Sequence, residues 1–389
     1  MTDKPSRGLA DVIAASTALS DIDGKAGRLF YRGYDIHDLA GKISFEECTH
    51  LLQRDRLPTR AQLDGLAAEL EAGRRLGRLV EGAVDEIAAQ QSPMEALRSL
   101  VSLASAEDPD KDSNSADANQ RKAARLVAQQ PILVARYHAA RGGARPVEAD
   151  PGLGIAGNFL LQITGRRPAP REIEIFDECL VLHADHTMNA STFAGRVCAA
   201  TLSDMHSGVV AALGTLKGSL HGGANEQVMR TLLEILEDRA AVQKDPRVIE
   251  DAVGAAVSER LRRGEKLMGF GHRVYKTEDP RATHLRRMAE ELANSTGDET
   301  YFRMSKRMEE VVFAEKGLYP NVDFYAASVY HYLGIPTDLF TPVFSVSRMA
   351  GWTAHIMEQH ADNRLIRPDS EYIGERDQKW VPIDEREKE

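Results

Sequence analysis

The sequence predicts a globular protein that is almost entirely α-helical, and three observations support this prediction. Apolar residues repeat at helical spacing in most of the chain. Only residues 17–34 alternate apolar and polar side chains in the way a strand does. The 389 residues are 42% hydrophobic, which is ample for a large core, and this length suggests two or three domains.

The N-terminal region predicts one hairpin and then a helix. Residues 17–34 surround Asp23-Gly24 and Gly27, which favour tight turns, so a short hairpin is expected. Ser44 with Glu47 three positions later is typical of a helix N-terminus. The apolar residues that then follow at helical spacing are Phe45, Cys48, Leu51 and Leu52.

Helical spacing continues to the C-terminal region with two predicted breaks. Residues 104–119 are rich in Asp, Ser and Ala and contain one Pro, which predicts an exposed loop. Gly142-Gly143 predicts a turn. The apolar residues that keep helical spacing include Leu63, Leu66, Ala67, Leu70, Leu285, Met288, Ala289, Leu292, Met304, Met308, Val311 and Val312, and those expected in the core are Met349, Trp352 and Ile356.

Charge and cysteine content disfavour several functions. The 49 Lys and Arg against 59 Asp and Glu give a net charge of −10, so a nucleic-acid partner is disfavoured and an anionic substrate needs a local basic cluster. Cys48, Cys179 and Cys198 lie far apart, which supports neither a disulfide framework nor a cysteine zinc site. Without an export signal or an apolar run of about 18 residues, a cytoplasmic protein with no membrane role is expected.

Three short motifs carry the candidate acid/base chemistry. His221 has glycines on both sides, which let the backbone turn tightly and let a ligand approach closely. His272 also follows glycines, and arginine and lysine residues come shortly after it, as an anion site requires. Asp323 follows a Pro-Asn pair, where a turn would aim its carboxylate. Two histidines and one aspartate make an acid/base set.

Six motifs occur in a fixed order along nearly the whole chain. They are Tyr31-Arg-Gly-Tyr-Asp-Ile36, Ala184-Asp-His-Thr-Met-Asn-Ala-Ser-Thr192, His221-Gly-Gly-Ala-Asn225, Gly269-Phe-Gly-His-Arg-Val-Tyr-Lys276 with Asp279-Pro-Arg281, Asn321-Val-Asp323, and Asn363-Arg-Leu-Ile-Arg-Pro368. In this order they resemble the citrate synthase family. One such motif alone is a weak signal, whereas six in register are a specific one.

The resemblance implies a helical fold of two domains. In the family, both ends of the chain build a large helical domain, and a smaller helical domain is inserted between them. We therefore expect the large domain at residues 1–222 and 335–389 and the small domain at 223–334. The catalytic residues then lie at the hinge and the cleft, which suits closure over the substrate and exclusion of water.

The resemblance also implies a reaction. The family joins the methyl carbon of acetyl-CoA to the ketone of oxaloacetate and hydrolyses the citryl thioester, an acyl transfer at the entry to the tricarboxylic acid cycle. A proton next to a thioester is weakly acidic, so its removal needs a base and a group that stabilises the enol oxygen. Asp323 resembles the base, His221 the donor to the thioester oxygen, and His272 the donor to the ketone. No permanently bound cofactor and no metal is expected.

Further residues match family positions on the two substrates. Arg281, Arg348 and Arg367 resemble the arginines that bind the carboxylates of oxaloacetate, the last one coming from the neighbouring subunit. His186 resembles a further histidine on oxaloacetate. A homodimer with shared active sites, which can assemble further, is therefore expected. The expected coenzyme A segment is Lys266, Leu267, Met268, Gly269, Phe270 and Gly271.

Each of these residues also has a purely structural interpretation. His221 can be a turn or core histidine, and Asp323 an ordinary helix N-cap. Arg281 can be a solvated charge at a helix start, and Arg348 the partner of a surface carboxylate. For His183, near the candidate substrate histidine, packing is the preferred interpretation.

Three other functions stay open. The close variant is 2-methylcitrate synthase, which takes propionyl-CoA, although the motifs at 271–276 and 335–340 look more like citrate synthases. A metal-dependent hydrolase would use His183, Asp185 and His186. A non-catalytic helical assembly protein would keep only the fold. Because the family match begins near the N-terminus, little inhibition by NADH through an N-terminal extension is expected.

Overall fold

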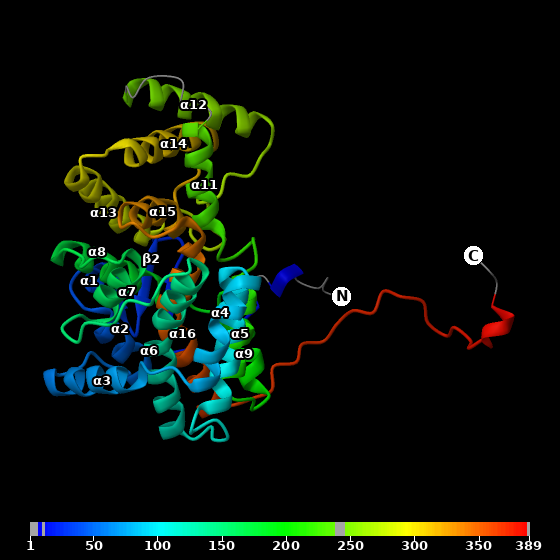
Figure 1. The fold of residues 1–389 in the computed structure, drawn as a ribbon. Coiled ribbons are helices and arrows are strands. Elements are labelled where there is room, and N and C mark those ends of the chain that lie inside the picture. The colour runs from blue at the N-terminus through cyan, green and yellow to red at the C-terminus, as the bar shows by residue number, and fades with distance from the viewer. Residues whose placement is uncertain (1–6, 10–11, 238–245, 387–389) are drawn as a thin grey trace.

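A helical body with an extended C-terminal tail makes up the protein (Figure 1). The computed structural model describes residues 7–9, 12–237 and 246–386 of the chain. The α-helices are α1 (Ile36–Leu39), α2 (Phe45–Arg54), α3 (Arg60–Gly73), α4 (Arg78–Gln90), α5 (Pro93–Glu107), α6 (Ala116–Arg141), α7 (Ile155–Thr164), α8 (Pro170–His183), α9 (Ala190–Ala200), α10 (Met205–Leu216), α11 (Ala224–Glu237), α12 (Pro246–Arg262), α13 (Pro280–Thr296), α14 (Thr300–Lys316), α15 (Val322–Tyr332) and α16 (Phe340–Ala361). The all-α prediction is confirmed.

The predicted hairpin is present near the N-terminus. The strands are β1 (Ser20–Asp23), β2 (Arg28–Tyr31) and β3 (Tyr34–Asp35). β1 pairs antiparallel with β2, and Ser20 lies opposite Tyr31. The turn between them ends at Gly27, whose φ of 66° is one that glycine adopts without strain. β3 was not predicted, because two residues are too few to give a period.

Side-chain capping sets the first long helix, as the sequence predicts. Ser44 accepts a hydrogen bond from the backbone N–H of Glu47, and the Glu47 carboxylate accepts one from the backbone N–H of Ser44. This reciprocal pair satisfies two N–H groups that have no partner inside the helix. The predicted turn at Gly142-Gly143 is also present, directly after α6.

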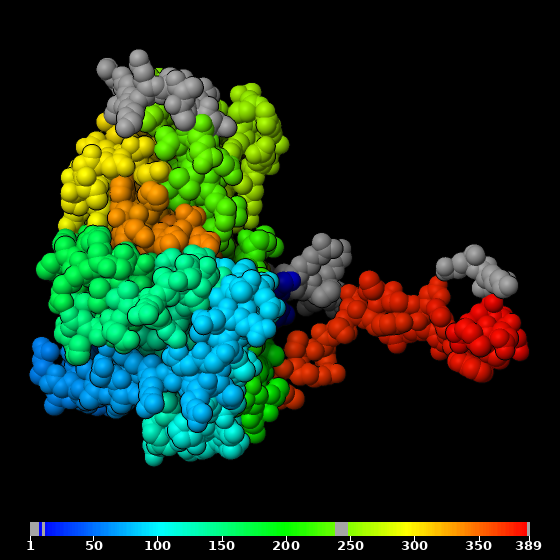
Figure 2. Space-filling model, viewed as in Figure 1, coloured from blue at the N-terminus to red at the C-terminus, as the bar shows by residue number. Residues whose placement is uncertain are grey.

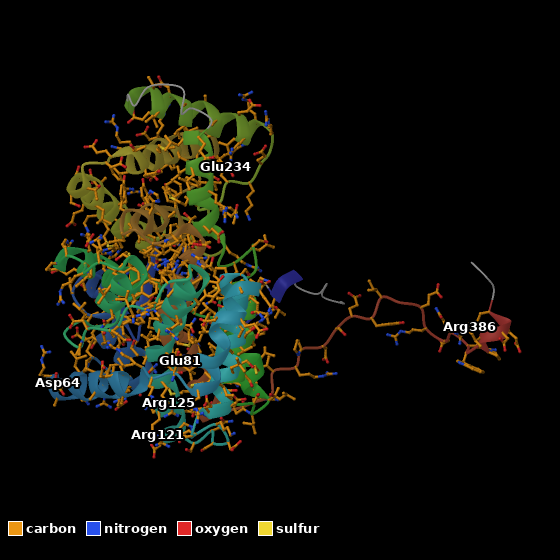
Figure 3. All side chains as sticks on the ribbon, in the orientation of Figure 1. Asp64, Glu81, Arg121, Arg125, Glu234 and Arg386 are labelled. Carbon is orange, nitrogen blue, oxygen red and sulfur yellow. The ribbon has the colours of Figure 1, made fainter. Side chains whose placement is uncertain are left out.

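The exposed loop predicted at 104–119 is wrong in its extent. α5 and α6 extend into it from both sides and reduce it to 108–115. Ser115 is the N-cap of α6. Asp108 is buried, and its carboxylate accepts hydrogen bonds of 2.9 and 2.7 Å from Arg125, which is labelled in Figure 3. In this stretch, Ser115 therefore caps a helix, and Asp108 forms an ion pair with a helix residue.

α16 is the central helix of the larger part of the body. It packs against α2, α5, α6, α8, α9 and α10. Met349, Trp352 and Ile356 on α16 are fully buried, which confirms the core prediction for them. Within the described residues, no helix is long and apolar enough to cross a membrane.

Helices α11 to α15 gather at one end of the body and contact one another (Figures 1 and 2). They fall within 223–334, the segment that the resemblance assigns to the small domain. Those boundaries stay a prediction. After α16 the chain leaves the body as a tail, which begins against α9, where the Asn363 side chain donates to the Ala200 carbonyl at 3.2 Å, and then extends away from the body (Figure 2).

Candidate active site

His221 lies in the loop between α10 and α11. The loop closes tightly because the N–H of Gly222 donates to the carbonyl of Leu216 at 3.0 Å. A Cβ on Gly222 would lie 2.6 Å from that same carbonyl oxygen, so the close approach requires glycine. The loop places Nε2 of His221 2.8 Å from the Ser191 Oγ and 3.3 Å from the Ser191 backbone nitrogen.

The contact with Ser191 fixes the protonation state of His221. A backbone N–H can only donate, so Nε2 accepts and the ring proton resides on Nδ1. Burial, and then the charge of Arg348, lower the pKa of His221 to about 4. At neutral pH this histidine is therefore uncharged and has one N–H that it can donate.

His272 is held in a similar way, but with the other tautomer. Its Nδ1 accepts from the backbone N–H groups of Val274 and Tyr275, at 3.0 and 3.2 Å. The ring proton is therefore on Nε2. Burial, and then the charge of Arg281, lower the pKa of His272 to about 4. His272 is thus a second neutral donor.

The glycine segment before His272 lies beside the start of α15. The N–H of Asn321 donates to the Gly269 carbonyl, and the N–H of Gly271 donates to the Tyr319 carbonyl, both at 2.9 Å. The Asn321 side chain adds a bond of 2.9 Å to the Gly271 carbonyl. These bonds place the loop of His272 next to the first turn of α15, which carries Asp323.

The N-terminal hairpin supports this loop from the larger part of the body. The N–H of Lys276 donates to the carbonyl of Gly24 at 2.8 Å. A Cβ on Gly24 would lie 2.4 Å from the Val274 carbonyl oxygen, so the turn of the hairpin rests directly on the loop of His272.

Asp323 has a carboxylate oxygen, Oδ1, that is buried and has no hydrogen-bond partner among the described residues. The N-cap of α15 is Asn321, whose side chain accepts from the Asp323 N–H at 3.0 Å. The interpretation of Asp323 as the cap is therefore wrong. Burial raises the pKa of Asp323 to about 7, although the charge of Arg281 opposes the shift. Such a carboxyl group can exchange a proton near neutral pH.

Arg281 is buried at the first turn of α13, with 2% of its surface exposed. It donates bidentately to Asp279, from Nε at 2.9 Å and from Nη2 at 2.7 Å. Asp279 also accepts from the N–H of Val322 at 3.2 Å, which ties α13 to α15. Burial alone raises the pKa of Asp279, but Arg281 outweighs it and keeps the carboxylate ionised. The interpretation of Arg281 as a solvated charge is wrong.

Arg348 is buried on α16 and has no carboxylate partner within the described part of the chain. Its Nε donates to the His183 carbonyl at 2.7 Å, and its guanidinium lies 4.8 Å from the centre of the Phe344 ring. Burial lowers the pKa of Arg348 to about 10, so it stays charged at neutral pH. The expected alternative of a surface ion pair is wrong, and this buried cation is free to bind an anion.

His186 lies in the turn after α8, and 8% of its surface is exposed. Its ring centre is 5.2 Å from that of His272, and its Nε2 is 3.3 Å from the Tyr275 hydroxyl. Burial, and then the charge of Arg281, hold the pKa of His186 well below its usual value. His186 therefore faces the same space as His272.

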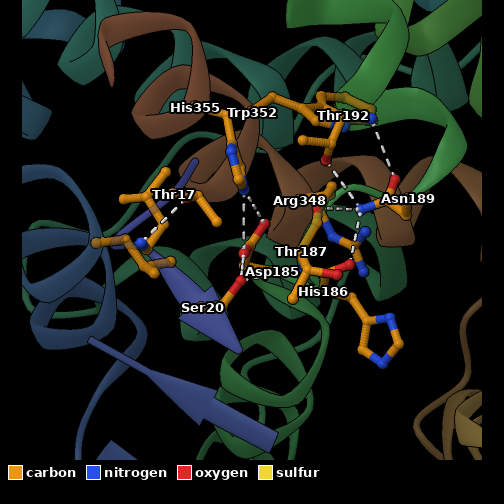
Figure 4. A network of polar contacts seen from close by, with 12 residues as sticks. Thr17, Ser20, Asp185, His186, Thr187, Asn189, Thr192, Arg348, Trp352 and His355 are labelled. Carbon is orange, nitrogen blue, oxygen red and sulfur yellow. Dashed lines mark hydrogen bonds and ion pairs between the residues drawn. The ribbon is translucent and has the colours of Figure 1, made fainter. Parts of the chain in front are cut away.

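The three residues of the metal alternative point in different directions. His183 is fully buried, its Nδ1 bonds the Cys179 carbonyl at 2.8 Å, and its ring packs against Phe344, which confirms the packing prediction. Figure 4 shows Asp185 directed away from the ring of His186. In the described residues, no group of three His, Cys, Asp or Glu side chains is placed to hold a metal ion.

The remaining predicted site residues are placed as follows. In the coenzyme A segment, Leu267 and Phe270 are buried, whereas Lys266 is exposed. Arg367 follows α16 in the C-terminal tail, with 75% of its side chain exposed; its one ion-pair partner in the described part of the chain is Asp369, at 2.8 Å. One chain by itself thus brings together the predicted histidines, Asp323 and two of the three arginines.

Sequence reasoning missed the residues that orient the site. Ser191 and Tyr275 lie inside quoted motifs, and Asp279 and Asn321 are motif residues as well. The order of residues does not show which ring nitrogen Ser191 faces, because that contact joins the first turn of α9 to the loop between α10 and α11.

Known proteins resemble this chain over nearly its whole length. A family model described as "Citrate synthase, C-terminal domain" matches residues 8–369. Citrate synthase 2 of Bacillus subtilis is 49% identical over 98% of this chain and 99% of its own length. A 2-methylcitrate synthase of Shewanella oneidensis is 39% identical over 97% of both chains. The citrate synthase of Thermoplasma acidophilum, solved as a ternary complex with carboxymethyl coenzyme A and oxaloacetate, superposes with a TM-score of 0.89 at 33% identity, covering 99% of this chain and 100% of that one.

Proposed function

The chain belongs to the citrate synthase family, and we propose that its three neutral or proton-exchanging groups, His221, His272 and Asp323, condense acetyl-CoA with oxaloacetate. The thioester of the product is then hydrolysed to release citrate and coenzyme A. The observation that carries the residue roles is the buried, unpartnered Oδ1 of Asp323. The charges of Arg281 and Arg348 act on this carboxyl, and the same two arginines act on the neutral rings of His272 and His221.

Asp323 is the base that removes a proton from the acetyl methyl group. A base works best when its pKa lies near the working pH, because it is then both largely ionised and strong enough to accept the proton. The value of about 7 meets this requirement, whereas an ordinary aspartate is a much weaker base. The free Oδ1 is the atom that takes the proton.

His221 donates its Nδ1–H to the thioester oxygen as the enol forms. A neutral imidazole suits this role, because its N–H can donate a hydrogen bond to the oxygen on which negative charge develops. Ser191 maintains the required tautomer by occupying Nε2. His272 donates its Nε2–H to the ketone of oxaloacetate, and the backbone N–H groups on its Nδ1 maintain the opposite tautomer.

Oxaloacetate binds with its carboxylates at Arg348 and Arg281. Arg348 is the stronger candidate, since it is a buried cation without a carboxylate partner among the described residues. Arg281 already has Asp279, and its remaining N–H groups are available to a second carboxylate. His186 lies beside His272 and completes the contacts with this substrate.

Coenzyme A lies along residues 266–271. Gly269 has a φ of 85°, and a Cβ there would lie 2.7 Å from Val228 and 2.9 Å from Phe324, so the segment follows this path against the helices only because the residue is glycine. Lys266 and Lys276 are exposed near the two ends of the segment and supply positive charge for the phosphates.

Two domains, 1–222 with 335–389 and 223–334, close over these substrates. Support comes from the placement of the candidate residues: His186 and Arg348 belong to the larger part, whereas His272 and Asp323 belong to the helices gathered at one end. Closure brings these sets together and excludes water.

Thiol release tests this function. Purified protein with oxaloacetate and acetyl-CoA should release free coenzyme A, and no release would contradict the proposal. Propionyl-CoA should give a lower kcat/KM, because a pocket fitted around one methyl discriminates against an added methylene by about 10- to 200-fold. A preference for propionyl-CoA would reassign the chain to the 2-methylcitrate synthases that it also resembles.

The active site is shared between two copies of the chain, and Arg367 of one copy completes the site of the other. Two features support this proposal. Arg367 is exposed on a tail that extends away from its own body, and the tail carries large exposed apolar side chains. Ile373 is 92% exposed and Trp380 is 79% exposed, and contact with a second copy of the chain would remove these apolar side chains from water.

Complementation between inactive chains tests this sharing. Asp323→Asn and Arg367→Leu homodimers should each be nearly inactive. When they are unfolded, mixed and refolded, about half of the dimers are mixed and each has one intact site, so roughly a quarter of wild-type activity should return. If confirmed mixed dimers show no recovery, Arg367 does not serve the neighbouring site.

A cytoplasmic location stays a prediction.

A further inference from the structure

The turn that carries His186 has an unfavourable backbone conformation. Thr187, directly after His186, has a φ of 49°, in the left-handed region that β-branched residues rarely adopt. Such a residue persists only where its surroundings hold it in place. The contacts around Thr187 therefore control where the ring of His186 points.

A single hydroxyl connects both sides of this turn. The N–H of Thr187 donates to the Ser20 Oγ at 3.0 Å, and the Ser20 hydroxyl donates to the Asp185 carboxylate. Nε2 of His355 lies 3.2 and 3.3 Å from the two Asp185 carboxylate oxygens (Figure 4). We call Asp185, Ser20 and His355 the turn clamp. Its contacts fix both neighbours of His186 in the chain, Asp185 through its carboxylate and Thr187 through its backbone N–H.

The far side of the clamp is fixed as well. Arg196 donates to Nδ1 of His355 at 3.1 Å, so the proton of this ring is on Nε2 and is directed at Asp185. Arg196 is itself held by Glu358 at 2.5 Å and Gln359 at 3.0 Å. Nε and Nη1 of Arg196 and Nε2 of His355 thus each have an acceptor, as buried donors require.

The hairpin and α16 enclose the turn from opposite sides. The Tyr31 hydroxyl accepts from the Asp185 N–H at 3.1 Å and donates to the Asp185 carbonyl at 2.9 Å. Ser20 and Tyr31 are opposite each other in the sheet, so one strand pair supplies both contacts. On α16, a Cβ on Gly351 would lie 2.6 Å from Oδ1 of Asp185, which shows how closely this helix approaches.

We infer that Asp185, Ser20 and His355 are positioning residues for oxaloacetate. They touch no substrate; they hold the strained turn so that the His186 ring faces His272 and Tyr275. This inference rests on the proposed contact between His186 and oxaloacetate. It also gives Asp185 a task that differs from the metal ligand considered in the sequence.

Removing the shared hydroxyl tests the clamp. Ser20→Ala should raise KM for oxaloacetate at least fivefold, leave KM for acetyl-CoA within twofold, and change kcat less than KM. The matched control is Ser305→Ala, which removes another buried hydroxyl, whose one hydrogen-bond partner among the described residues is the Ser328 hydroxyl at 2.9 Å. A structural role alone would give both variants the same small loss of stability with unchanged KM, and that result would overturn the inference.

Two further variants complete the test. Adding Thr187→Gly to Ser20→Ala should recover at least half of the lost oxaloacetate affinity, because glycine adopts the left-handed conformation without the hydroxyl. No recovery would show that the strained turn is not what Ser20 holds. His186→Ala separates the two proposals. If this variant leaves KM for oxaloacetate unchanged, the proposed contact between His186 and oxaloacetate is wrong. If KM for oxaloacetate rises in His186→Ala but stays unchanged in Ser20→Ala, only the proposed role of the turn clamp is refuted.

Discussion

Replacing Asp323 with asparagine should remove the reaction and stabilise the protein at the same time. A pKa of about 7 in place of 3.8 is a difference of about 3 units, which at about 1.4 kcal/mol per unit costs the folded protein about 4 kcal/mol when the carboxyl is ionised. The asparagine amide that replaces the carboxyl is also buried without a partner, and this lowers the stability of the variant by about 1–3 kcal/mol. The expected net gain in the free energy of unfolding is therefore about 1–3 kcal/mol at pH 8.

The gain must depend on pH in one direction. Because folding raises the pKa of Asp323, the folded state takes up a proton as the pH falls through about 7. At lower pH the buried carboxyl is neutral, so it destabilises the folded protein less. The advantage of Asp323→Asn should therefore shrink by about 2 kcal/mol between pH 8 and pH 5.5. The control is Asp64→Asn on the exposed face of α3, because this substitution removes a carboxyl group that is not buried (Figure 3).

Urea unfolding at both pH values and thiol release measure the two effects. Turnover in Asp323→Asn should fall by about 10²- to 10⁴-fold. Exchange of the acetyl methyl protons into deuterated water, with a non-reacting oxaloacetate analogue bound, reports proton removal directly. Undiminished exchange, or a variant that is no more stable than the wild type at pH 8, would refute the assignment of Asp323 as a buried base.

Three further predictions concern the same site. Because the base must be ionised, kcat/KM should fall about tenfold per pH unit below about 7 and level off above it, and a profile that stays flat down to pH 5 would contradict the pKa of Asp323. Gly24→Ala should lower kcat by about 10- to 100-fold, since its Cβ displaces Val274 in the loop of His272, whereas Gly82→Ala on α4, where a Cβ meets no atom within 4 Å, should leave kcat unchanged. Arg348→Leu should raise KM for oxaloacetate by about 10- to 100-fold, the value of a charge-assisted contact, as steady-state kinetics can measure.

The sequence predicts the site residues because their motifs are local. Glycines beside His221 and His272 determine where the backbone can turn, and a capping pair such as Ser44 and Glu47 involves residues only three positions apart. The prediction was wrong where a residue depends on a partner farther along the chain. Asp108 was expected in an exposed loop, but it is buried and bonded to Arg125.

By itself, then, the sequence determined the helical class, the hairpin and the identities of the acid/base candidates, because periodicity, capping and glycine placement are properties of neighbouring residues. Only the tertiary structure decided their protonation and orientation. The tautomer of His221 depends on Ser191, and the pKa of Asp323 depends on burial and on Arg281. These quantities arise from desolvation and from contacts between segments far apart in the chain, which the order of residues does not specify.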